Sequence, residues 1–116
     1  MKTKDSTARA VALADLLKYQ SDAIVSREII KQKTGSVTLF AFDKGQGLSE
    51  HTAPFDALVY IIDGSARIRI AGRPVIVKKG QMIIMPANKP HALKAERKFK
   101  MLLIMIKTAD KGGYEK

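Results

Sequence analysis

The sequence contains no cysteine and no tryptophan, and only two of its 116 residues are histidines. Without cysteine the chain forms no disulfide, no thiolate metal site and no cysteine nucleophile. Its apolar stretches are also short, because none approaches the roughly 20 residues that a membrane-spanning helix needs. These absences predict a protein without a membrane span. They also leave His51 and His91 as the first candidates for residues that bind a ligand or a metal.

Acidic residues are scarce relative to basic ones, with 11 against 21 and a net charge of +10. A solvated basic surface is the favoured interpretation. Nucleic-acid binding needs a clustered basic face with stacking aromatic side chains, whereas here the basic residues are scattered and tryptophan is absent. The densest basic group, which would attract anions in general, consists of Arg67, Arg69, Arg73, Lys78 and Lys79.

Secretory signals place an apolar segment after their first positive charges. Here Lys2 and Lys4 are followed by polar residues. We therefore expect a cytoplasmic location.

Two periodicities divide the chain. Leucines and alanines recur at helical spacing over residues 8–19, which predicts a short amphipathic helix. From Ile24 onward, apolar segments alternate with turn residues in the manner of an all-β barrel or sandwich. We expect an N-terminal arm with a short helix over 1–22, a β-barrel over 23–108 and a flexible tail over 109–116. The expected strands cover 24–31, 36–42, 58–63, 66–71, 74–78, 81–85, 91–95 and 99–106.

Two of these segments, 82–85 and 101–106, are apolar without interruption. A continuous apolar run indicates a strand that is covered on both faces. A second subunit would provide the outer cover, so we expect a homodimer; the leucine face of the N-terminal helix is the competing candidate. The methionines in these strands are interpreted as adaptable core fillers.

The spacing around the two histidines resembles that of the cupin superfamily, whose motifs are G-x5-H-x-H-x3,4-E-x6-G and G-x5-P-x-G-x2-H-x3-N. The matching positions are Gly45, His51, Gly64, Gly80, Pro86 and His91. The resemblance implies a small single-domain bacterial cupin, whose fold is an all-β antiparallel double-stranded β-helix, or jelly-roll, barrel.

The resemblance also implies a pocket inside the barrel. Its expected lining comprises His51, Ala53, Ala57, Val59, Ile61, His91 and Leu93. Two of the four metal-ligand positions of the family are occupied by Ala53 and Ala57, while Asn88 and Ala95 replace the glycine and asparagine of the second motif. Two imidazoles alone hold a divalent metal weakly.

One interpretation is therefore that His51 and His91 bind a divalent transition metal (Fe, Mn, Ni, Cu or Zn) with low affinity. The alternative is that both rings form hydrogen bonds only with the backbone or with water. Asp56 would complete a triad of two histidines and one carboxylate. It lies one residue before the position of the family ligand, however, so its side chain faces away from the pocket unless a bulge intervenes.

Three classes of function follow from these residues. The favoured one is a cupin with a depleted metal site that binds a small polar or anionic molecule in the barrel pocket. The second is a metal-dependent enzyme, similar to dioxygenase or isomerase cupins, that uses His51 and His91 with water or Asp56; enzymatic activity is thus left open. The third is binding of an anionic macromolecule by the basic surface.

Overall fold

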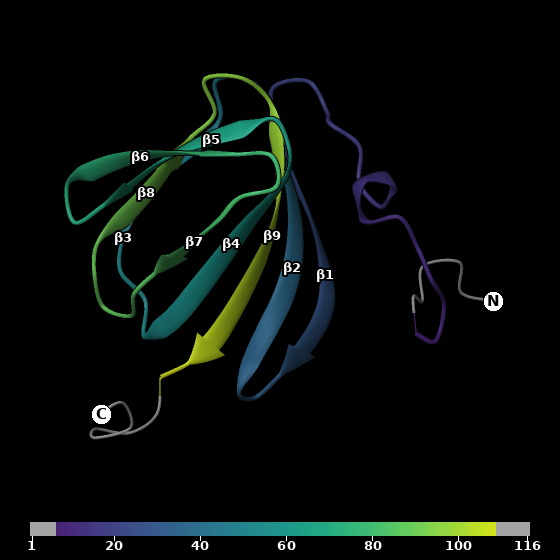
Figure 1. Cartoon of the computed structure of the whole chain (residues 1–116), viewed down its shortest axis with the longest axis horizontal. Coiled ribbons are helices and arrows are strands. Elements are labelled where there is room, and N and C mark those ends of the chain that lie inside the picture. Colours follow the sequence, from purple (N-terminus) through teal and green to yellow (C-terminus); the bar gives the residue numbers. More distant parts are fainter. Residues whose placement is uncertain (1–6, 109–116) are drawn as a thin grey trace.

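The computed structural model describes residues 7–108, which form two antiparallel sheets packed against each other (Figure 1). One sheet has five strands in the order β1-β2-β9-β4-β7, and the other has four in the order β3-β8-β5-β6. This arrangement confirms the all-β jelly-roll prediction. The strands are β1 (Ile24–Gln32), β2 (Gly35–Phe42), β3 (Gly47–His51), β4 (Phe55–Asp63), β5 (Ser65–Ile70), β6 (Arg73–Lys78), β7 (Met82–Met85), β8 (His91–Lys94) and β9 (Phe99–Lys107).

The main core lies between the two sheets. Phe42 and Phe99, both fully buried, stack with ring centroids 4.5 Å apart. In β5, Ala66 and Ile68 point into this core while the intervening arginines are exposed, as an alternating strand requires. The inner faces of the two sheets therefore exclude water along most of their length, and the remaining space is a cavity at one end.

The outer face of the five-stranded sheet is covered at one end only. Leu39 and Ala41 of β2 are fully buried there, and they pack with Leu17 in a second apolar cluster. Leu102 of β9 joins this cluster, whereas Met101 beside it joins the main core. The continuous apolar run of β9 thus reflects a central strand with apolar neighbours on both faces.

The helix predicted over residues 8–19 is reduced to one 3₁₀ turn, η1 (Leu13–Asp15). Its N-cap residue Ala12 provides no side-chain cap. The carbonyl oxygens of Ala14 and Leu16, which a longer helix would use internally, instead accept hydrogen bonds from Lys100 (2.7 Å) and Arg27 (3.3 Å). The leucine spacing therefore serves packing on the sheet. Among the residues described, no helix has the length and apolar character to cross a membrane.

One strand was not expected from the sequence. β3 is short, polar and largely exposed, so it shows no apolar run, and it pairs only with β8 at the edge of its sheet. β4 also begins at Phe55, ahead of the predicted start at residue 58. The predicted flexible tail at 109–116 lies outside the described residues, as do residues 1–6 of the predicted arm.

Candidate functional site

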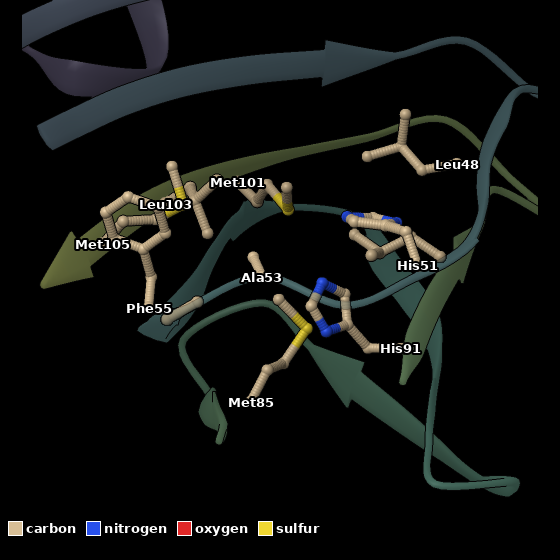
Figure 2. Close-up of a pocket in the computed structure, with 11 residues that line it drawn as sticks. Leu48, His51, Ala53, Phe55, Met85, His91, Met101, Leu103 and Met105 are labelled. Carbon is tan, nitrogen blue, oxygen red and sulfur yellow. The ribbon is translucent and has the colours of Figure 1, made fainter. Parts of the chain in front are cut away.

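A cavity of about 60 Å³ lies at the end of the barrel where β3 and β8 meet the five-stranded sheet (Figure 2). Both histidines line it: His91 is buried, at 7% exposure, and His51 is exposed at the edge. Most of the remaining wall is apolar. The lining residues are Leu48, His51, Ala53, Phe55, Ala57, Met85, His91, Leu93, Met101, Leu103 and Met105.

Strand pairing brings the two histidines together. His51 at the end of β3 is the direct cross-strand partner of His91 at the start of β8, and such partners project on the same face of a sheet. Their ring centroids are 4.4 Å apart, in an edge-on arrangement. The register shifts between Leu48 and His51, which explains how two residues three positions apart both reach the cavity.

The loop before His91 is fixed to the segment that follows His51. Asn88 adopts a φ of +64°, a left-handed conformation in which asparagine and glycine are the residues best tolerated. This explains why asparagine is acceptable at the glycine position of the motif. The Asn88 N–H donates to the Ala53 carbonyl (2.8 Å), and the Ala87 N–H donates to Asp56 Oδ1 (2.9 Å). Asp56 therefore holds the loop and does not line the cavity.

Backbone contacts set the tautomer of both imidazoles. His51 Nδ1 lies 2.8 Å from the Ser49 carbonyl, and His91 Nδ1 lies 3.2 Å from the Lys89 carbonyl. Because a carbonyl oxygen only accepts hydrogen bonds, each Nδ1 carries the proton, and Nε2 of each neutral ring keeps its lone pair. Burial lowers the pKa of His91, and the nearby His51 lowers it further. His91 thus presents a neutral ring with an accepting nitrogen near neutral pH.

The predicted pocket residues divide into two groups. His51, Ala53, Ala57, His91 and Leu93 line the cavity. Val59 and Ile61, which were expected beside them, lie instead in the core between the sheets with 0% exposure, because β4 continues past the cavity.

The sequence interpretation missed the part of the wall that comes from β9, where Met101, Leu103 and Met105 alternate toward the cavity. Their alternation is not visible in the sequence, because the residues between them are apolar as well. A parity argument along β9, once one inward residue was known, would have identified all three.

The residues of the cavity do not fit a metal of the four-ligand kind that the resemblance implies. No carboxylate lines the cavity, and among residues 7–108 there is no group of three or more histidine, cysteine, aspartate or glutamate side chains that would hold a metal ion. A hard divalent cation in this cavity would have two imidazoles and no negative charge to neutralise it.

Solved structures with the same fold span a range of sequence similarity. A conserved protein of unknown function from Streptococcus pyogenes is 37% identical, with a TM-score of 0.84, over 88% of this chain and 90% of that one. A cupin superfamily protein from Desulfitobacterium hafniense is 27% identical, with a TM-score of 0.81, over 85% and 91% of the two chains.

A cupin 2 conserved barrel domain protein from Leptotrichia buccalis is 44% identical, with a TM-score of 0.79, over 81% of this chain but only 46% of the other. No curated protein matches the sequence. The family model for the cupin domain matches residues 38–107, which is more than half of the chain and includes every strand from β3 to β9. The chain therefore belongs to the cupin family.

Proposed function

We propose that this cupin binds a small polar or anionic molecule in the barrel cavity, with His51 and His91 contacting its polar end. The observation that supports this proposal is the pair of imidazoles, 4.4 Å apart, at one side of a cavity whose other lining is apolar. Convergent polar groups on an apolar wall are typical of a small-molecule site.

The volume limits the size of the ligand. A cavity needs roughly 10–15 Å³ of such space to hold one water molecule, so a cavity of about 60 Å³ holds on the order of five groups of that size. Pockets for drug-sized ligands measure roughly 300–1,000 Å³. We therefore favour a short carboxylic acid, such as formate or acetate, over a sugar. A longer chain would require Met85, Met101 or Met105 to change rotamer, which methionine does readily.

The imidazoles offer complementary chemistry to such an acid. A short carboxylic acid is ionised near neutral pH and only accepts hydrogen bonds, so its binding requires one imidazole to take up a proton, after which Nε2 donates to a carboxylate oxygen. The net charge of +10 favours the approach of anions. The apolar wall formed by Ala53 and Ala57 then contacts the alkyl part of the ligand.

A thermal-shift titration with formate, acetate and propionate tests this proposal. We expect the shortest acids to raise the melting temperature of the wild type and to have no effect on a His51→Ala, His91→Ala double variant. Arg69→Gln is the matched control, because it removes one positive charge from an exposed position on β5 outside the cavity. Equal shifts for all three proteins would remove the histidines from the site and reject the proposal.

A soft metal ion is the second candidate, and a specific observation favours it. Three methionine side chains, Met85, Met101 and Met105, line the same cavity as the two histidines. Thioether and imidazole ligands suit Cu(I), whereas Mn and other hard cations prefer carboxylate oxygen. This candidate replaces the hard divalent metal that the family pattern implies, because none of the described residues places a carboxylate in the cavity.

Anaerobic competition of Cu(I) against a chelator tests the soft-metal candidate. A Met85→Leu, Met101→Leu variant keeps the side-chain volume and is expected to bind Cu(I) at least tenfold more weakly than the wild type. Met82→Leu is the control, since Met82 is 50% exposed and lies outside the cavity. Equal Cu(I) affinity in all three proteins, or tighter binding of Mn(II) than of Cu(I), would contradict this candidate.

A further inference from the structure

A second hollow lies at the end of the barrel opposite the histidine cavity. β4 begins at Phe55, which lines the cavity, and ends at Asp63, which lines an open groove of about 610 Å³. Three turns surround this groove, and they connect β4 to β5, β6 to β7 and β8 to β9. Four of its seven lining residues are basic, and they are Lys78, Lys79, Arg97 and Lys98. The fold thus gathers positive charge that is separated in the sequence.

The order of the strands places these basic residues on two sides of the β4–β5 turn. β4 lies between β7 and β9 in one sheet, and β5 lies between β6 and β8 in the other. The β6–β7 connection, with Lys78 and Lys79, is therefore on one side of Gly64, and the β8–β9 connection, with Arg97 and Lys98, is on the other. The basic side chains form two pairs that line a common groove.

Backbone contacts with Gly64 hold the two pairs at a fixed separation. The Gly64 carbonyl accepts a hydrogen bond from the Lys79 N–H (3.0 Å). Gly64 also packs on the Lys98 carbonyl so closely that the space for a Cβ is filled. Within the β6–β7 connection, the Gln81 side chain accepts a hydrogen bond from the Lys78 N–H (2.9 Å). Both walls of the groove are therefore anchored to the turn between them.

Three of the four basic side chains have no acidic neighbour to neutralise them. Lys78, Lys79 and Arg97 are exposed, and within residues 7–108 none of their side chains forms an ion pair or a hydrogen bond with another side chain. Lys98 contacts the ring of Tyr19, with 4.8 Å between the ammonium nitrogen and the ring centre. Most of the positive charge of the groove is therefore available to an incoming anion.

The groove contains one carboxylate among its described lining residues, that of Asp63. Asp63 Oδ2 accepts the hydrogen bond of the Tyr19 hydroxyl (2.6 Å), so this oxygen is already occupied by the N-terminal segment. Four basic residues against one acidic residue leave a formal charge of +3 in the groove.

We infer that the groove binds a small soluble molecule with two phosphate groups, such as pyrophosphate or a diphosphate ester, each group contacting one basic pair. A guanidinium donates two parallel hydrogen bonds to phosphate oxygens, and an ammonium acts as a compact positive charge. Arg97 and Lys98 supply both kinds of donor on one side, and Lys78 and Lys79 supply two ammonium groups on the other. The Ser65 hydroxyl lies in the same lining as a further donor.

The lining favours a small soluble anion over nucleic acid or a membrane. Single-stranded nucleic acid stacks its bases on aromatic side chains, and a membrane-surface site inserts apolar ones. The described lining of the groove has neither kind. Its volume of about 610 Å³ lies within the roughly 300–1,000 Å³ of small-molecule pockets. The groove and the histidine cavity share no lining residue, so this inference does not depend on the ligand proposed for the cavity.

Calorimetric titration of the full chain with inorganic pyrophosphate tests the inference. We expect one pyrophosphate to bind per chain, roughly tenfold more tightly than inorganic phosphate, which reaches only one basic pair. The double variant Lys79→Gln, Arg97→Gln removes one charge from each pair and is expected to bind pyrophosphate at least tenfold more weakly. Asp63→Asn removes the carboxylate and is expected to tighten binding.

The matched control is the double variant Arg69→Gln, Arg73→Gln. It removes the same number of positive charges from exposed positions on β5 and β6 outside the groove, and it is expected to keep the wild-type affinity. Equal weakening in the two double variants would assign the binding to net charge and overturn the inference. Pyrophosphate binding no tighter than phosphate binding, or no binding at about 1 mM pyrophosphate, would overturn it as well.

Vesicles of phosphatidylglycerol test whether a lipid headgroup is the source of the phosphate. We expect the wild type not to sediment with them at about 150 mM salt, where attraction between exposed charges is screened. Cosedimentation that the Lys79→Gln, Arg97→Gln variant abolishes would assign the groove to a membrane surface and overturn the inference.

Discussion

Gly64 and Gly72 both lie in turns with positive φ, at +74° and +82°, but their surroundings differ. A Cβ on Gly64 would fall against the Lys98 carbonyl oxygen, whereas a Cβ on Gly72 meets no atom within 4 Å. We expect Gly72→Ala to cost about 1 kcal/mol of stability through backbone conformation alone, and Gly64→Ala to cost about 2 kcal/mol more. Urea unfolding of both variants measures the difference, and equal costs would show that the Lys98 backbone yields.

Protonation of His91 makes the free energy of unfolding depend on pH, and the direction of its pKa shift gives the sign of that dependence. Its pKa in the folded protein is lowered below 6.5 by burial and by the neighbouring His51, so the unfolded chain binds the proton more readily. Stability from this residue is complete above about pH 6.5 and is lost as the pH falls from there through the lowered pKa. The melting temperature of the wild type between pH 8 and 5 reports this loss.

The variant His91→Gln is the control for that pH dependence. It removes the titrating group while keeping an amide of similar polarity, so its melting temperature should fall less than that of the wild type below pH 6.5. Identical pH profiles would assign the effect to other groups.

At the scale of elements, the N-terminal segment depends on Tyr19 for its attachment to the barrel. The Tyr19 hydroxyl donates to Asp63 Oδ2 at 2.6 Å, and the ammonium groups of Lys98 and Lys100 lie 4.8 and 5.1 Å from the centre of its ring. Because the site is half-buried, we expect Tyr19→Phe to cost about 1 kcal/mol. The exposed Tyr60 provides the control variant Tyr60→Phe. Chemical unfolding compares the two, and equal stabilities would contradict the attachment.

Strands were predictable wherever one physical pattern dominated. The alternation of β5 and the turns on either side of most strands were readable, because burial of one face imposes a period of two. β3 could not be predicted in this way, because it has only one apolar residue, Leu48, and its position depends on pairing with β8. The leucines before residue 20 predicted a helix, but tertiary hydrogen bonds from Lys100 and Arg27 overrode that local preference.

The candidate site was predictable only in part. The register of the motif indicated that His51 and His91 share a pocket, but neither spacing nor composition indicated that Met101 and Met105 form its far wall. That wall comes from a strand about ten residues after His91, and which of its faces points inward is decided by pairing with β2 and β4.

At the scale of the whole molecule, the basic residues are scattered along the sequence, although Lys78, Lys79, Arg97 and Lys98 line one open groove. Arg67 of the densest basic group forms an ion pair with Glu96 (3.1 Å), and both side chains are exposed. We expect no binding of duplex or single-stranded nucleic acid at micromolar protein near physiological salt, and only salt-sensitive binding at low salt. Fluorescence anisotropy from 20 to about 200 mM salt measures it. Submicromolar binding at the higher concentration would return the third class of function to consideration.

β9 has a consequence for how the molecule would respond to its ligand. Its odd-numbered residues from Met101 to Met105 line the cavity, and the even-numbered Leu102 lies on the opposite face, where it packs in the same cluster as Leu17. One strand is thus both a wall of the cavity and part of the surface on which the N-terminal segment packs. If ligand binding shifts β9, it changes the free energy with which the N-terminal segment packs on the sheet, and by thermodynamic reciprocity detachment of that segment changes the ligand dissociation constant by the same factor.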